Sequence, residues 1–206
     1  MRKFSLFFLL SILFHPAFCQ EGLLQFTANY FRSNPFIGEY SQFVRHLMND
    51  PDLQEKQTLK RTDTSLFSFT GSYKTFNPFF FKPRKLKITL EETPAQFLDS
   101  LPPDTLLVYH LMAYAGNDVK AGQDIQKEFA KLHKQFKRKF AASNFQEISS
   151  ETIERGAVHN YFVGNSDIAP LTIAWAKLNQ EYVLDLILRI KVSENFAVLP
   201  TTFNDP

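Results

Sequence analysis

Cysteine is almost absent from this chain. The single cysteine, Cys19, lies close to the N-terminus, so the rest of the chain holds neither a disulfide nor a thiol nucleophile. Zinc sites built on cysteine are excluded for the same reason. The histidines that follow Cys19 form no HExxH motif and no pair at i,i+4, so we expect no metal ion and no cofactor. They are His46, His110, His133 and His159.

Glycine is also scarce, at 7 residues. The chain has no GxGxxG, no P-loop and no GxSxG motif, the glycine-rich signatures of nucleotide sites and nucleophile elbows. Carboxylate pairs such as Glu91-Glu92 occur, but a glycosidase needs two carboxylates across a cleft, which one sequence does not show. We therefore expect a protein without catalytic activity. A hydrolase of envelope polymers is a third hypothesis, and its first sign would be converging carboxylates or His159 near an acid.

A long apolar run is missing as well. Residues 4–14 form an apolar stretch of eleven residues, short of the roughly 20 that a membrane-spanning helix needs. Arg2 and Lys3 precede this stretch, and Ala17-Phe18-Cys19 follows it. This pattern predicts a secretory signal peptide over residues 1–19 and a secreted or periplasmic protein with no transmembrane segment after cleavage.

Cys19 offers an alternative, since a lipid on it would make the protein an envelope lipoprotein. The bulky Phe18 stands where such signals need a small residue, so cleavage without a lipid is favoured. Without residues 1–19 the chain has 21 basic and 21 acidic residues. A neutral exported protein is a poor candidate for binding nucleic acid. We expect one domain over residues 20–192 and a C-terminal tail over residues 193–206.

Phenylalanine, in contrast, is abundant, at 23 residues, and predicts a dense aromatic core. The clearest period lies in residues 118–141, where one face of a long helix carries bulky apolar side chains. These are Ile125, Phe129, Leu132, Phe136 and Phe140. A second helix is predicted from Asn34-Pro35 to about Asn49, and a short one over residues 93–101. Residues 20–33 fit either a helical turn or a loose lead-in.

Alternating patterns predict the strands. They cover residues 65–74, 85–91, 105–115, 145–150, 157–163, 171–176 and 182–190, with residues 75–83 as a long hairpin tip. Residues 52–63 are polar and are expected to form an exposed connector. The predicted class is α+β, with a mostly antiparallel sheet of about six to seven strands, one long helix and one or two shorter helices packed on it.

Two features are candidate binding residues. The first is the hairpin tip, where three phenylalanines precede a basic cluster, and the second is a basic stripe on the long helix. These residues are Phe79, Phe80, Phe81, Lys82, Arg84 and Lys85 in the tip and Lys131, Lys134 and Arg138 on the helix. Three consecutive side chains point to different sides, so the tip is either covered on both sides or presents an aromatic surface. The stripe is either a solvated face that suits the helix dipole or an anion-binding ridge.

The leading hypothesis is an exported binding or accessory protein of the cell envelope or extracellular space, with an unknown protein or envelope component as partner. The alternative is a binder of a lipid or another hydrophobic ligand, since the aromatic residues exceed what a small core needs. Its cavity would lie between the sheet and the long helix, lined by residues such as Phe129, Phe136, Tyr109 and Trp175. An anionic surface is a further possible partner. His110 and His159 are interpreted as structural histidines.

Overall fold

A computed structural model provides the structure of the chain. It describes residues 22–60, 67–95, 104–140, 145–152, 156–163 and 168–191. The predicted signal peptide and the predicted C-terminal tail therefore lie outside the described residues.

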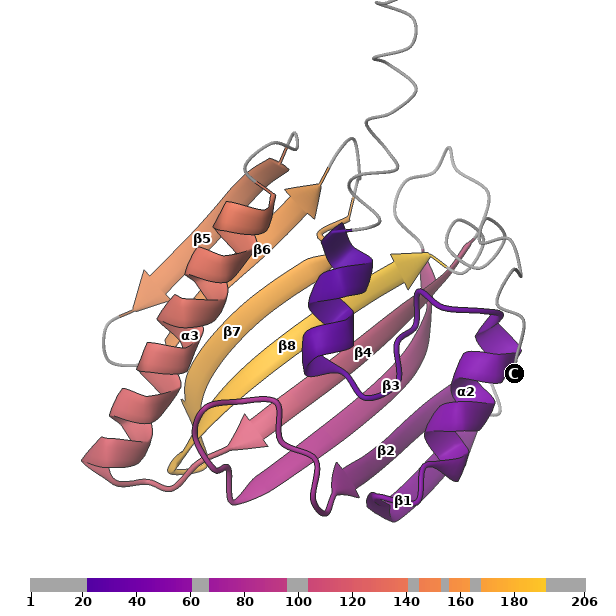
Figure 1. The fold of residues 1–206 in the computed structure, drawn as a ribbon, viewed down its shortest axis with the longest axis horizontal. Helices are drawn as coiled ribbons and strands as arrows, with labels where there is room; N and C mark the ends of the chain where they lie inside the picture. The colour runs from indigo at the N-terminus through magenta and orange to yellow at the C-terminus, as the bar shows by residue number, and fades with distance from the viewer. Residues whose placement is uncertain are drawn as a thin grey trace, which may run out of the picture.

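One antiparallel sheet of eight strands organises the molecule, which confirms the α+β prediction with one strand more than the upper estimate (Figure 1). The strands lie in the order β1-β2-β3-β4-β8-β7-β6-β5. Their bounds are β1 Leu53–Lys60, β2 Phe67–Tyr73, β3 Lys85–Ala95, β4 Asp104–Tyr114, β5 Phe145–Thr152, β6 Gly156–Val163, β7 Leu171–Leu178 and β8 Glu181–Lys191. Each meander of four strands runs from an edge to the centre, where β4 pairs with β8.

The described helices lie on one face of this sheet (Figure 1). They are a helix over residues 22–30, α2 over Tyr40–Asn49 and α3 over Val119–Lys139. The connection from β4 to the far edge strand β5 runs through α3, as the long-helix pattern predicts. No helix among the described residues is both long and apolar enough to cross a membrane.

The core forms where alternate strand residues meet the apolar stripes of the helices. On β4, Leu107, Tyr109 and Leu111 are completely buried beneath the helices, while Val108 and His110 lie on the opposite, helix-free face. The apolar stripe of α3 is buried in the same layer. Aromatic rings supply much of this layer, as the phenylalanine count predicts, and they bury large apolar areas that stabilise the fold.

The helix over residues 22–30 resolves a segment that the sequence left open. Its Phe26 is buried, and Thr27 and Tyr30 are buried beside it. Phe26 meets the ring of Phe136 on α3 edge to face, with centroids 5.7 Å apart. This helix therefore belongs to the core and packs directly beside α3.

Residues 52–63 were wrongly predicted as an exposed connector, because Leu53–Lys60 forms the edge strand β1. The segment is polar because an edge strand buries little: only Leu53 among its described side chains is buried. Glu55 adopts a positive φ of 53° where the register with β2 shifts. Such a bulge and exposed charge are typical of edge strands and hide the alternation that predicts a strand.

The predicted helix start at Asn34-Pro35 was also wrong, since α2 begins at Tyr40. The Asn34 side chain instead accepts a hydrogen bond from Phe36 N at 2.9 Å and donates to Leu24 O at 3.0 Å. Gly38 has a φ of +76°, a left-handed conformation that interrupts any helix begun at Pro35. The Asn34 side chain thus closes a turn between two helices instead of capping one.

The short helix predicted over residues 93–101 is wrong at its start. Thr93, Pro94 and Ala95 extend β3 and pair with β4, so the strand continues past the proline. Among the described residues the pairing of β2 with β3 ends at Glu91, so Pro94 pairs with β4 alone, and a proline is tolerated where one side of a strand is unpaired. Residues 96–101 lie outside the described residues.

The carboxylate of Asp52 holds the base of the hairpin tip through hydrogen bonds. It accepts hydrogen bonds from Thr75 Oγ1 at 2.5 Å, Phe76 N at 2.8 Å and Thr75 N at 3.1 Å. The Thr75 hydroxyl, followed by the Phe76 and Thr75 amides, lowers the pKa of Asp52. We expect Asp52→Asn to lower the unfolding free energy by about 1 kcal/mol at pH 7.

The pH dependence of this loss follows from the lowered pKa. A carboxylate with a depressed folded-state pKa stabilises the protein above its unfolded pKa of about 4 and loses that effect as the pH falls through the folded value. Urea unfolding of wild type and Asp52→Asn should therefore differ at pH 7, and the difference should shrink as the pH falls from about 4 through the lower folded-state pKa. A difference that is constant across this range would contradict the assignment.

Candidate functional site

The hairpin tip folds back onto α3, and this brings the two sequence-predicted features into contact. Phe79 and Phe81 are buried, at 6% and 7% exposure, whereas Phe80 is 53% exposed. The two alternatives for the tip therefore both hold in part: neighbouring side chains point apart, so two rings enter the core and one faces solvent. Phe79 and Phe81 stack on each other with centroids 5.7 Å apart.

A buried carboxylate joins the tip to the helix. Glu128 on α3 is completely buried, and its Oε2 accepts a hydrogen bond from Phe80 N at 3.2 Å. Its Oε1 accepts from Lys131 Nζ at 3.0 Å, and the same ammonium lies 5.5 Å from the centre of the Phe80 ring. Lys131 thus neutralises Glu128 and covers Phe80. It contributes less to an anion-binding ridge than the sequence suggested.

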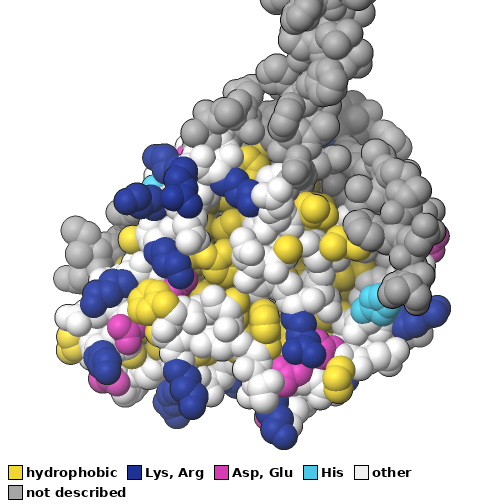
Figure 2. All heavy atoms as spheres, viewed as in Figure 1, with side chains coloured by type: hydrophobic (Ala, Val, Ile, Leu, Met, Phe, Trp, Pro, Cys, Tyr) yellow, Lys and Arg dark blue, Asp and Glu magenta, His cyan; other side chains and the backbone are white. Residues whose placement is uncertain are grey.

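A hollow of about 440 Å³ opens beside this contact. Its wall comes from the helix over residues 22–30, from the tip and from the C-terminal end of α3. The residues that line it are Phe26, Asn29, Tyr30, Pro78, Gln135, Arg138 and Lys139. Basic side chains gather over this end of α3 (Figure 2). Aromatic rings, a proline and two cations therefore share one surface hollow.

Tyr30 gives the hollow a fixed hydroxyl. Tyr30 Oη donates to Gln135 Oε1 at 2.5 Å, and its ring packs between Phe26 and Phe79 at centroid distances of 4.9 and 6.2 Å. Burial, followed by the charge of Glu128, raises the pKa of Tyr30 to about 12. The hydroxyl therefore keeps its proton at physiological pH and adds no negative charge beside Arg138.

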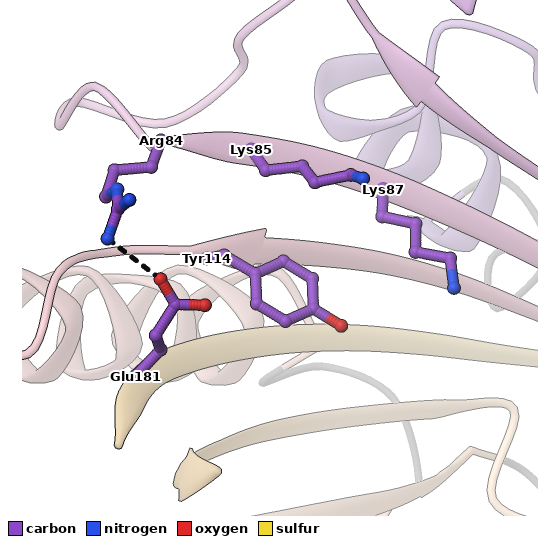
Figure 3. Close-up of a pocket in the computed structure, with 5 residues that line it drawn as sticks. All are labelled: Arg84, Lys85, Lys87, Tyr114 and Glu181. Carbon is purple, nitrogen blue, oxygen red and sulfur yellow. Dashed lines mark hydrogen bonds and ion pairs between the residues drawn. The ribbon is translucent and has the colours of Figure 1, made fainter. Parts of the chain in front are cut away.

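The basic residues that follow the tip lie elsewhere. Arg84 and Lys85 line a second hollow of about 500 Å³ together with Lys87, Tyr114 and Glu181 (Figure 3). It opens on the helix-free face, because Leu86, which alternates with these lysines, is buried. Arg84 Nη1 pairs with Glu181 at 3.0 Å, and Lys85 Nζ pairs with Glu55 at 2.7 Å. These two cations are thus already neutralised.

Lys82 and Lys134 are exposed and line neither hollow. The structure therefore groups Phe80 with Lys131, places Arg138 in the adjacent hollow, and separates Arg84 and Lys85 from both. The lining residues Phe26, Tyr30 and Gln135 are additions that sequence reasoning missed. The only sequence signal for them was the aromatic content of residues 20–33, because their neighbours come from distant parts of the chain.

The residues suggested for a cavity between the sheet and α3 pack against other rings. Phe136 lies 4.2 Å from both Phe140 and Tyr161, measured between ring centroids. Tyr109 packs against Phe31 and Phe43 at 4.8 and 5.6 Å. Trp175 and Phe129 contact Tyr182 and His159. Each of these four side chains therefore contacts other rings of the aromatic layer.

A cluster of histidine and carboxylate side chains lies further along α3. His133 on α3, Glu147 on β5 and His159 on β6 converge on the helix-covered face. His159 Nδ1 lies 2.6 Å from Glu147 Oε1, and His133 Nδ1 lies 3.7 Å from the same oxygen. A contact between His159 and an acidic side chain is the expected first sign of a hydrolase, and His159 makes this contact with Glu147.

The neighbours of this cluster fix its geometry. The rings of His133 and His159 stack with centroids 4.3 Å apart, and Tyr161 Oη lies 2.6 Å from His133 Nδ1. Burial, followed by the charge of Glu147, raises the pKa of Tyr161. Lys137 Nζ lies 3.4 Å from Glu147 Oε2. The sequence could not reveal the cluster, because it depends on the register that places Glu147 opposite Tyr161.

His110, the other histidine interpreted as structural, lies on the helix-free face. Its Nδ1 is 3.0 Å from Asp185 Oδ2 on β8, the neighbouring central strand. This pair joins the two meanders at the sheet centre.

Comparisons with models of protein families, with curated proteins and with solved structures give no match for this chain. The described residues define an α+β protein with one antiparallel sheet of eight strands, helices on one face and a hollow lined by aromatic, polar and basic side chains.

Proposed function

We propose that this protein is exported and binds a small amphiphilic anion, with the hollow beside α3 as its binding site. The observation that carries the proposal is that aromatic and proline side chains and two cations line one hollow. Phe26, Tyr30 and Pro78 are the apolar side chains of this lining, and Arg138 and Lys139 supply the charge. The ligand class is a short acyl or aryl group that ends in a phosphate or carboxylate.

The dimensions and the charges support this ligand class. A volume of about 440 Å³ lies within the usual range of small-molecule sites, roughly 300–1,000 Å³. Basic residues occupy three successive positions at the end of α3, Lys137 to Lys139, where the negative end of the helix dipole favours cations. Lys137 lies beside Glu147, while Arg138 and Lys139 line the hollow. Two cationic side chains in the lining favour a ligand that carries an anionic group.

Export is the second part of the proposal. It is supported by the residues before Gln20, where a basic start, a short apolar run and small residues follow one another. An envelope protein that binds an amphiphile would meet lipids and their breakdown products in that compartment. The leading hypothesis names an envelope component as one possible partner, and we propose that this component is an anionic amphiphile.

A calorimetric titration tests the site. Octyl phosphate should bind to the processed protein, and octyl glucoside, which has the same chain and no charge, should bind at least about tenfold more weakly, because charged hydrogen bonds contribute about 1.5–3 kcal/mol. The double variant Arg138→Ala/Lys139→Ala should lose about tenfold or more in affinity for octyl phosphate.

The matched control is Lys120→Ala/Lys127→Ala, which removes two exposed lysines from the same helix outside the hollow. It should bind octyl phosphate like wild type. Equal affinity for the charged and neutral probes, or an equal loss in both double variants, would overturn the proposed site.

A hydrolase is the second candidate function, on the contact between His159 and Glu147. His159 is only 7% exposed in its side chain, so a substrate has little access to the base that such a reaction needs. Binding without catalysis is therefore the preferred proposal. Robust turnover of a substrate by the purified protein would reverse this preference.

A further inference from the structure

We infer that His133, Glu147 and His159 form a binding site for a divalent transition-metal ion of the zinc type. One ligand atom from each residue lies within 4.8 Å of the ligand atoms of the other two. The three residues come from three different elements, α3, β5 and β6. The site is separate from the amphiphile hollow, none of whose lining residues it uses.

The donor set selects the class of metal. Two imidazoles and one carboxylate suit zinc and its neighbours, whereas calcium and magnesium prefer sites made of oxygen ligands. Zinc ligands at about 2.0–2.2 Å from the metal lie roughly 3.3 Å from one another in a tetrahedral site. The distances of 2.6 and 3.7 Å from Glu147 Oε1 to the histidine nitrogens fall on either side of this value. Small side-chain movements would therefore bring the ligands to a metal.

The surroundings hold the ligands in place. Phe129 stacks on the His159 ring with centroids 4.9 Å apart. Tyr161 Oη lies 2.6 Å from His133 Nδ1, the nitrogen that faces Glu147, so this hydroxyl would give up its contact when a metal binds there. The backbones of β5 and β6 fix Glu147 and His159 on the same face through the pairs Glu147 with Tyr161 and Ser149 with His159. Ring packing and strand pairing thus limit the movement of the ligand side chains. Three protein ligands leave a fourth position for water.

Lys137 also competes with a metal ion, because its ammonium pairs with a ligand side chain. Its ammonium lies 3.4 Å from Glu147 Oε2, and its side chain is 52% exposed. In the metal-free protein this ammonium partly neutralises the carboxylate, and a bound metal ion would repel it into solvent. Because the lysine competes with the metal for Glu147, its removal should strengthen metal binding. If the cluster were only a structural ion pair, neither wild type nor a variant that lacks Lys137 would bind a metal ion.

The test is a titration of the processed, untagged protein with zinc chloride after treatment with a chelator. Wild type should bind one zinc ion, and His133→Gln should lose at least tenfold in affinity. Lys137→Met should gain severalfold. The matched control is His110→Gln, which removes a histidine paired with Asp185 on the other face of the sheet and should leave the affinity unchanged.

Cobalt gives a second readout that does not depend on a variant. Wild type loaded with Co²⁺ should show the strong visible absorption of a four-coordinate site. Circular dichroism checks that His133→Gln, a partly exposed position, remains folded. The inference is overturned if wild type binds no zinc at micromolar concentrations, or if the His133 and His110 variants lose affinity equally. Neither result bears on octyl phosphate binding, so the amphiphile site is judged separately.

Discussion

Replacement of Phe136 by alanine should lower the free energy of unfolding by about 3–5 kcal/mol. Phe136 is completely buried on α3. Its ring contacts Phe26 from the helix over residues 22–30, Phe140 at the end of α3 and Tyr161 on β6. Alanine would remove contacts to all three elements and leave a cavity that such a rigid aromatic layer closes only in part.

Urea unfolding followed by far-ultraviolet circular dichroism measures this loss. Lys134→Ala is the control, since Lys134 is exposed on α3 two residues before Phe136. This variant should change the free energy of unfolding by less than about 0.5 kcal/mol. Phe136→Leu should lose much less than Phe136→Ala because it refills most of the volume. A loss below about 1 kcal/mol for Phe136→Ala would show that the packing of α3 on the sheet differs from the one described.

Replacement of Lys131 by methionine should cost about 2–3 kcal/mol. The change leaves the carboxylate of Glu128 completely buried with the Phe80 amide as its remaining described hydrogen-bond donor. Breaking a fully buried ion pair costs about 3–5 kcal/mol, and the lower figure applies because the Lys131 side chain is 41% exposed. Methionine keeps an apolar stem against Phe80, so packing is largely retained.

A double variant separates the charge effect from packing. Glu128→Gln together with Lys131→Met removes both charges, and the glutamine oxygen still accepts from Phe80 N. We expect the double variant to recover at least half of the stability that Lys131→Met loses, because no uncompensated charge remains buried. If the double variant is less stable than Lys131→Met, the ion pair is not what joins the tip to α3.

Phe136 and the pair of Glu128 with Lys131 both support the hollow proposed as a binding site. Phe136 holds the helix over residues 22–30 against α3, and Glu128 holds the tip against α3. Phe26 and Pro78, which line the hollow, are carried by the first helix and by the tip. A loss at either contact should therefore weaken the binding of octyl phosphate in addition to stability.

The sequence determined those elements whose signal is local. The helical period of Ile125, Phe129 and Leu132 predicted the long helix nearly to its observed ends. The alternation around Tyr109 and Leu186 predicted the two central strands. Both patterns arise because one face of an element meets the core, and the chain itself carries that periodicity. The α+β class follows from the order of these elements.

Only the tertiary structure decided which surfaces meet. The edge strand β1 has no apolar pattern, since its stability comes from pairing with β2. The hollow unites Phe26, Pro78 and Arg138, and the metal-type cluster unites His133, Glu147 and His159. Residues so far apart in the chain are neighbours only after the hairpin tip folds onto α3 and β5 pairs with β6. Such proximity depends on nonlocal packing and strand register, for which a single sequence has no period or motif.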